Sequence, residues 1–188
     1  MKKRLLIPIV LTITLLSSGF LQAQDTHMFA VRAGWQNSGI FIDGDELGDP
    51  HQAFYAGLYR DDRIVPMLFW GKGIEYMQAG FRIDDDNRSV FHYISVPLYL
   101  KFKVGPVFAL GGVAGNFRVG QTNWTNGEKS KASGDDQINF FDIPAHVGLG
   151  VTFFRVTVEA RYHWGLIPLD TEPDIMKQYF QLGAAVNF

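Results

Sequence analysis

Apolar side chains recur at every second position in several stretches of this chain, and this period of two constrains the fold more than any other feature. The clearest stretch spans 90–103, where one face carries Ile94, Val96, Leu98, Leu100 and Phe102. The last stretch keeps the same period from Phe180 to Phe188. Successive side chains of a β-strand point to opposite faces, so each stretch is predicted to be a strand with one apolar face.

Eight such strands are predicted, and each is long enough for the about 9–11 residues that a tilted strand needs to cross a bilayer. They cover about 27–35, 52–60, 64–82, 90–103, 106–119, 140–152, 155–165 and 178–188. The faces of the third and fifth strands stay unassigned, because glycines interrupt them. In the third, Gly71 and Gly73 suggest a bulge or bend.

The connections between these strands alternate in length. Short ones are expected at 61–63, 104–105 and 153–154, and longer ones at about 36–51, 83–89, 120–139 and 166–176. Short turns on one rim and long loops on the other are typical of outer-membrane barrels. The sequence therefore predicts an all-β fold, an eight-stranded antiparallel up-and-down transmembrane β-barrel with both termini on the periplasmic rim.

The first residues are typical of a secretory signal peptide. Three basic residues at positions 2–4 precede an apolar run from Leu5 to about Phe20, and Ala23 provides a small residue at a cleavage point. We expect cleavage after Ala23, which divides the chain into a signal peptide, 1–23, and one barrel domain, 24–188. No cysteine follows the apolar run, so a cysteine-linked lipid anchor is excluded.

Composition restricts the partners of the mature chain. Without the signal segment, 14 basic residues remain against 19 acidic ones, and this acidic balance argues against nucleic acid as a partner. After residue 23, no apolar run approaches the about 20 residues of a spanning helix. A chain like this can cross a membrane only as a closed barrel, because open sheet edges are not tolerated in lipid.

Alternation alone leaves two orientations open. The apolar face lies either against lipid or, as in a soluble periplasmic lipocalin-like carrier, around an internal pocket. The opposite face is rich in Gly, Tyr, Pro and Ser with single charges, which suits a crowded interior and favours lipid outside. Eight strands enclose only enough room for side chains, so we expect a plugged lumen. Its expected charge network consists of Arg32, Lys101, Lys103, Glu159 and Arg161.

Four segments resemble the small outer-membrane β-barrel family that includes the PorT-like proteins, a group of porin-family barrels of the OmpA and OmpX type. The segment Tyr-Ile-Ser-Val-Pro-Leu-Tyr-Leu-Lys at 93–101 is similar to that family's Tyr-x-x-(Ile/Val)-Pro-Leu-x-(Leu/Phe)-Lys strand. The segments 110–115, 147–151 and 158–166 resemble its glycine-rich, Gly-x-Gly and Glu-Ala-Arg-Tyr strands. The resemblance implies an outer-membrane location and, for some members, assistance in secretion. It implies no catalytic residues.

The sequence offers little enzyme chemistry, and we predict neither catalysis nor a cofactor. Nucleophile-elbow, zinc-protease, P-loop and dinucleotide motifs do not occur in it. Asp142 and His146 share a face but lie about 13 Å apart along a strand. His146 and His163 are expected on neighbouring strands, where an approach of the two side chains stays open; two histidines alone are more often structural than catalytic.

The long loops hold most of the acidic residues. We interpret them as solvated, with divalent-cation bridging to lipid phosphates as the sharper alternative. Within the first loop, 43–48 is only an incomplete calcium-loop motif, and Phe54 stands where the motif needs Glu. The acids concerned are Asp43, Asp45, Glu46, Asp49, Asp84, Asp85, Asp86, Glu128, Asp135, Asp136, Asp170, Glu172 and Asp174.

Four functions follow from these features. The leading one is a monomeric structural or interaction barrel in the outer membrane, with outer-membrane lipid and an unidentified protein as partners. The alternatives are an accessory for secretion or outer-membrane assembly, a lipid-active enzyme and the soluble carrier. The terminal strand ending in Phe188 resembles the strand by which assembly machinery recognises such barrels, so that machinery is a further expected partner.

Overall fold

The computed structural model describes residues 27–42, 45–46, 49–82, 88–125, 128–131, 140–166 and 175–188. The expected signal peptide, 1–23, lies outside these residues. Within the described part, no helix is long and apolar enough to cross a membrane. The strands are β1 (His27–Ile42), β2 (Asp45–Glu46), β3 (Asp49–Val65), β4 (Leu68–Arg82), β5 (Arg88–Val104), β6 (Val107–Thr125), β7 (Glu128–Lys131), β8 (Phe141–Asp142), β9 (Pro144–Phe153), β10 (Val156–Gly165) and β11 (Ile175–Asn187).

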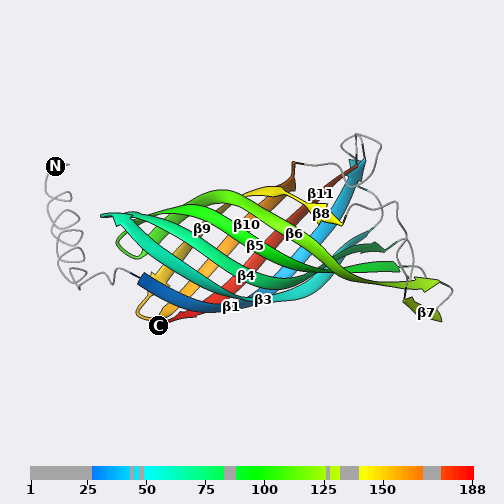
Figure 1. Ribbon diagram of the computed structural model, residues 1–188, viewed down its shortest axis with the longest axis horizontal. Helices are drawn as coiled ribbons and strands as arrows, with labels where there is room; N and C mark the ends of the chain where they lie inside the picture. The colour runs from blue at the N-terminus through cyan, green and yellow to red at the C-terminus, as the bar shows by residue number, and fades with distance from the viewer. Residues whose placement is uncertain are drawn as a thin grey trace, which may run out of the picture.

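Eight long strands form one closed antiparallel sheet. Each pairs with its sequence neighbour in the order β1, β3, β4, β5, β6, β9, β10, β11, and β11 pairs back onto β1 from Ala30↔Asn187 to Ile42↔Ile175. The short strand β2 pairs with the C-terminal end of β1, and β7 pairs with the C-terminal end of β6. The short strand β8 also pairs with β6, just before β9 does. Figure 1 shows the resulting barrel. The predicted eight-stranded up-and-down barrel is confirmed.

The apolar face of the strands points outward. Phe54, Leu58 and Leu149 are more than half exposed, whereas the alternate residues Tyr55 and Tyr59 are buried. In solution this exterior would be an apolar patch far larger than soluble proteins carry, but it matches the lipid-facing band of a membrane barrel. The soluble carrier, which needs its apolar face inside, is therefore wrong.

Several strand ends differ from the sequence prediction. The first strand continues beyond 35 to Ile42, and the fifth beyond 119 to Thr125. The alternation fades at polar residues such as Gln36 and Asn37, but backbone pairing continues, because antiparallel hydrogen bonds do not need an apolar face. The segments 36–42 and 120–125, expected in loops, therefore belong to strands.

The expected turn at 61–63 is also wrong. These residues continue β3 to Val65, and the turn lies at Pro66-Met67. A run of charged residues is typical of a turn, but here Asp61 points into the barrel and Asp62 points outward. The other two turns, at 105–106 and 154–155, lie one residue beyond the expected 104–105 and 153–154. Gly105 adopts a φ of 58°, a conformation that glycine reaches without steric cost.

The expected bulge or bend at Gly71 and Gly73 does not occur. Both keep a regular register with β3. Instead, a Cβ at Gly71 would lie 2.0 Å from the ring of Tyr99, and a Cβ at Gly73 would lie 2.6 Å from that of Tyr59. These glycines are needed because two tyrosine rings pack directly against the inner wall.

Candidate functional site

The inward positions carry a set of charged side chains, which we call the lumen network. It contains four cations and four carboxylates, and each residue is at most 6% exposed. Because a buried charge without a partner is costly, such a set requires pairing within the barrel. The members are Arg32, Lys101, Arg161 and Lys177, with Asp61, Glu75, Asp142 and Glu159.

The centre of the network is a carboxylate between two guanidinium groups. Arg32 Nη2 on β1 lies 3.1 Å from Glu159 Oε2 on β10, and Arg161 Nε donates to Glu159 Oε1. The Arg32 guanidinium lies 3.8 Å from the centre of the Tyr59 ring, a cation–π contact. The Glu159 carboxylate therefore joins two strands that are far apart in sequence, β1 and β10. The Tyr59 ring covers one of its two cations, Arg32.

A second group lies toward the end with the short turns. Asp61 on β3 forms an ion pair with Lys101 on β5 and accepts a hydrogen bond of 2.7 Å from the Tyr99 hydroxyl. The Lys101 ammonium is also 4.6 Å from the centre of the Phe108 ring. Lys103, two positions further along β5, is half-buried near the turn at Gly105.

A third group surrounds the Glu75 carboxylate and includes Tyr59, whose ring contacts the central group. Glu75 on β4 accepts hydrogen bonds from the Tyr59 hydroxyl and, at 3.2 Å, from Gln181 Nε2. The same Gln181 nitrogen donates to Gln36 Oε1 at 2.9 Å. Strands β1, β3, β4 and β11 are thus connected through side chains as well as through their backbones.

The fourth group lies toward the end with the long loops. Lys177 on β11 is 2.6 Å from Asp142 Oδ2 on β8, and Asn116 Nδ2 donates to the same oxygen at 3.1 Å. The Lys177 ammonium lies 4.2 Å from the centre of the Tyr93 ring. Charged pairs therefore occur at several levels of the lumen.

The two histidines that the sequence placed on neighbouring strands do meet. The rings of His146 and His163 stack with their centroids 4.8 Å apart, and His163 stacks in turn on Tyr179 at 4.1 Å. Both histidines are buried. Asp142 bonds to Asn116 and Lys177, not to His146. In the part of the chain that the structure describes, no three His, Cys, Asp or Glu residues form a metal-binding group.

Of the residues expected in the charge network, the structure brings Arg32, Glu159 and Arg161 into one group and places Lys101 in another. Sequence reasoning missed Asp61, Glu75 and Lys177 and gave Asp142 no partner. The alternation of the strands could have identified two of these residues as inward-facing. Asp61 is in phase with Tyr59, and Lys177 is in phase with Tyr179 and Gln181. The side chains of the loop acids lie outside the described residues.

A closed eight-stranded barrel with an apolar exterior and a charged interior defines a class, the outer-membrane β-barrel proteins. The family model for the outer membrane protein beta-barrel domain matches residues 26–171, and the chain belongs to this family. Its location is the cell outer membrane. No curated protein matches the chain in sequence.

Two solved structures illustrate the similarity. The attachment invasion locus protein Ail of Yersinia pestis, in complex with a heparin analogue, is 17% identical, with a TM-score of 0.57 over 86% of this chain and 99% of Ail. Neisserial surface protein A is 15% identical, with a TM-score of 0.56 over 85% of this chain and 97% of that protein. At these identities the similarity extends to the fold alone.

Proposed function

We propose that this protein is a membrane-anchored scaffold whose lumen is closed to solutes and whose long-loop rim contacts partners outside the cell. The observation that carries the proposal is the lumen network. Its ion pairs join strands that are not direct neighbours, such as β1 with Arg32 and β10 with Glu159, which flank β11 along the inner wall. Large side chains, including Tyr93, Tyr99 and Met77, are fully buried beside these pairs.

Conductance in planar lipid bilayers tests whether the lumen is closed. We expect the purified barrel to give no steady single-channel current. A matched triple variant, Arg32→Ala, Glu159→Ala and Arg161→Ala, removes the central group and should either conduct or unfold. A stable ohmic current through the natural protein would contradict the scaffold proposal and indicate a transport role.

The interaction role is supported by the length of the strands. Strand β6 continues to Thr125 and pairs there with β7, and β1 reaches Ile42, so backbone pairing extends well beyond the polar residues where the alternation fades. Binding residues commonly lie on connections carried by a rigid scaffold, and these paired strands are such a scaffold. A photo-crosslinking residue at Ser130 on β7 should give adducts on intact cells. The matched control is a crosslinker at Phe153, beside a short turn. Equal labelling from both would contradict this role.

A role as an accessory to secretion is a second candidate, which rests on the resemblance of 93–101 to the PorT-like proteins. This segment forms β5, with Tyr93, Ser95, Tyr99 and Lys101 pointing inward and buried. The motif thus contributes to both faces of the barrel wall: Tyr93, Pro97 and Lys101 point inward, and Val96, Leu98 and Leu100 point outward. This alternation supports a packing role as readily as a secretory one. A deletion strain that secretes its usual proteins at normal levels would remove this candidate.

Recognition by the assembly machinery is proposed from the last strand. β11 ends beside β1, where the Phe188 amide donates to the Phe29 carbonyl at 2.8 Å, and the Phe188 side chain is exposed. Phe188→Ala should lower the fraction of barrel assembled in cells but not the refolding yield in detergent. Among the described strands, closure of the sheet leaves no long edge free for pairing. We therefore propose a monomer, which light scattering in detergent tests.

A further inference from the structure

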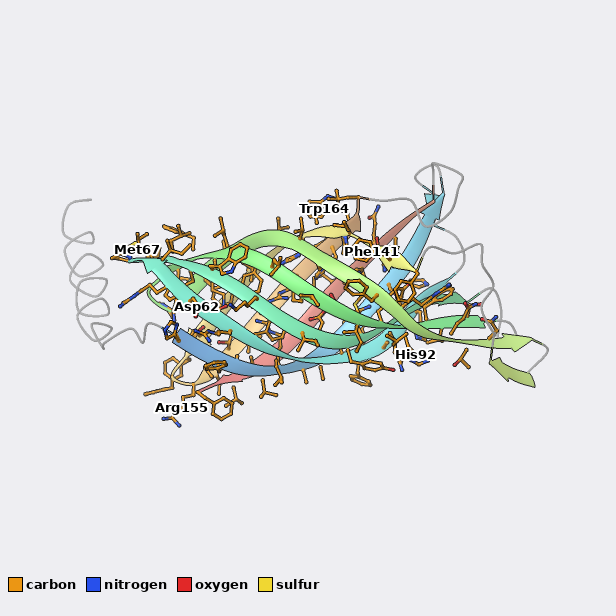
Figure 2. All side chains as sticks on the ribbon, in the orientation of Figure 1. Asp62, Met67, His92, Phe141, Arg155 and Trp164 are labelled. Atoms are coloured by element: carbon orange, nitrogen blue, oxygen red, sulfur yellow. The ribbon has the colours of Figure 1, made fainter. Side chains whose placement is uncertain are left out.

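A second group of charges lies on the outside of the barrel, at the end with the short turns. This rim cluster consists of His27, Arg60, Asp62 and Lys72, from β1, β3 and β4. Asp62 Oδ1 is 2.6 Å from both Arg60 Nε and His27 Nδ1, and Asp62 Oδ2 is 3.7 Å from Lys72 Nζ. Figure 2 places Asp62 near the same end as Met67 and Arg155, and His92 toward the opposite end.

The rim cluster is on the lipid-facing surface, not in the lumen. Arg60 and Asp62 are in phase with the exposed Phe54 and Leu58 along β3, while Asp61 between them points inward. Lys72 is in phase with the exposed Ile74 along β4. Charged side chains on the lipid face are costly at the bilayer centre but tolerated near the interfaces. The cluster therefore lies toward the short-turn end of the lipid-facing surface, where headgroups are within reach of its long side chains.

Aromatic residues support this position. Trp70 is partly exposed and pairs with Asp62 in the β3–β4 register, and Phe29 is exposed with the Arg60 guanidinium 5.2 Å from its ring centre. Tryptophan and other aromatic side chains gather where a membrane barrel leaves the hydrocarbon. At the other end of the same band, the outward hydroxyl of Tyr76 lies 2.6 Å from His92 Nδ1.

The charges of the rim cluster do not balance. Arg60 and Lys72 are directly opposite each other in the β3–β4 register, an arrangement of like charges that destabilises a sheet unless an anion lies between them. Asp62 supplies one negative charge for these two cations, and His27 adds a third basic group at its side. Among the residues of this surface that the structure describes, one unit of positive charge remains, beside an apolar wall formed by Leu58 and Ile74.

We propose that Arg60 and Lys72 bind the phosphate of an anionic phospholipid in the periplasmic leaflet, with Asp62 holding the two cations in place. The lipid phosphate completes the charge balance, and the acyl chains of the lipid lie along the adjacent apolar wall. Trp70, which lies between Lys72 and the short turn, borders the headgroup. A net negative lipid fits better than a zwitterionic one, because the remaining positive charge needs a partner without an ammonium group of its own.

Trp70 provides a local reporter for this site. In a chain with Trp35, Trp124 and Trp164 replaced by Phe, quenching of Trp70 is measured in phosphatidylcholine vesicles with increasing brominated phosphatidylglycerol, and then with brominated phosphatidylcholine. We expect phosphatidylglycerol to be preferred at this position by about fivefold, the size expected for one cation at a headgroup surface. Higher ionic strength should reduce the preference.

The double variant Arg60→Gln, Lys72→Gln should abolish the preference, whereas Arg155→Gln, which removes an exposed cation beside a different short turn, should leave it unchanged. If the double variant does not fold, Lys72→Gln alone should still lower the preference, because Lys72 is the more exposed of the pair. Equal quenching by both lipids in the parent chain would overturn the proposal. So would an undiminished preference in a folded variant, or a loss in Arg155→Gln equal to that in the double variant, which would indicate a diffuse surface charge.

Discussion

The lumen network and the rim cluster use the same residue types in opposite surroundings. In each, one carboxylate bonds two cations, Glu159 with Arg32 and Arg161 inside, and Asp62 with Arg60 and Lys72 outside. The Glu159 side chain is 1% exposed, whereas that of Asp62 is 25% exposed. A buried charge that loses its partner is left without solvation, while an exposed one regains water or a lipid headgroup. The comparison indicates that the lumen pairs maintain the barrel, and the rim pairs bind what lies around it.

The largest effect is expected for Glu159→Gln, which leaves two guanidinium groups facing each other without a carboxylate. The free energy of unfolding should fall by about 3–5 kcal/mol, as for other buried ion pairs that lose one partner. Urea unfolding of the barrel in lipid vesicles, followed by gel mobility without boiling, measures it. A loss below about 1 kcal/mol, the range of exposed pairs, would remove the distinction between the two groups.

The next effect concerns a charge placed on the lipid face away from both groups. Leu149, in the middle of β9, is 67% exposed to lipid. Leu149→Arg should destabilise the barrel by about 2–4 kcal/mol, as expected near the bilayer centre. The same unfolding assay compares it with Leu149→Ala, for which we expect a clearly smaller loss. Similar losses in the two variants would show that charge is not the cause, and would weaken the placement of the rim cluster within reach of the headgroups.

Asp61→Asn should have an intermediate effect. Asp61 bonds one cation, Lys101, and one hydroxyl, that of Tyr99, so fewer charges lose their partner than at Glu159. Removal of a buried hydrogen bond to a charged group costs about 1.5–3 kcal/mol. If the thermal unfolding midpoint of Asp61→Asn equals that of Glu159→Gln, the number of cations bonded to the carboxylate does not determine the loss of stability.

The smallest effect on stability is expected for Asp62→Asn at the rim. Exposed ion pairs contribute about 0–1 kcal/mol, so the urea midpoint should shift little. Lipid preference at Trp70 should nevertheless change, because Arg60 and Lys72 lose the group that positions them. A large loss of stability without a change in lipid preference would reverse the comparison between rim and lumen.

The number of strands, their order along the chain and the outward phase of their apolar residues could be predicted from the sequence. Lipid on one side of every strand enforces a period of two, and segments such as 90–103 show it clearly. Strand ends were not predictable from that pattern, because β1 and β6 continue where lipid no longer contacts them. The inward position of Asp61 was not predictable for a related reason. A charged residue within a strand resembles a turn residue unless its partner, here Lys101, is known.

Partners within the lumen could be predicted only in part. Alternation identifies which residues point inward, including Arg32 and Glu159, but not which of them meet. That depends on the curvature and stagger of the closed sheet, which bring together residues 127 positions apart. Glu75 was missed because the glycines of its strand obscured both faces.

The pairing of β11 with β1 has a consequence for how this protein comes into being. The first described strand finds one of its two neighbours only when the last strand arrives, since the two share an unbroken register from Ala30 to Ile42. A chain stopped before β11 would present two long unsatisfied edges, which lipid does not accept. Closure thus acts as a test of completeness: only a chain that includes β11 can complete the sheet and satisfy every long edge within the membrane.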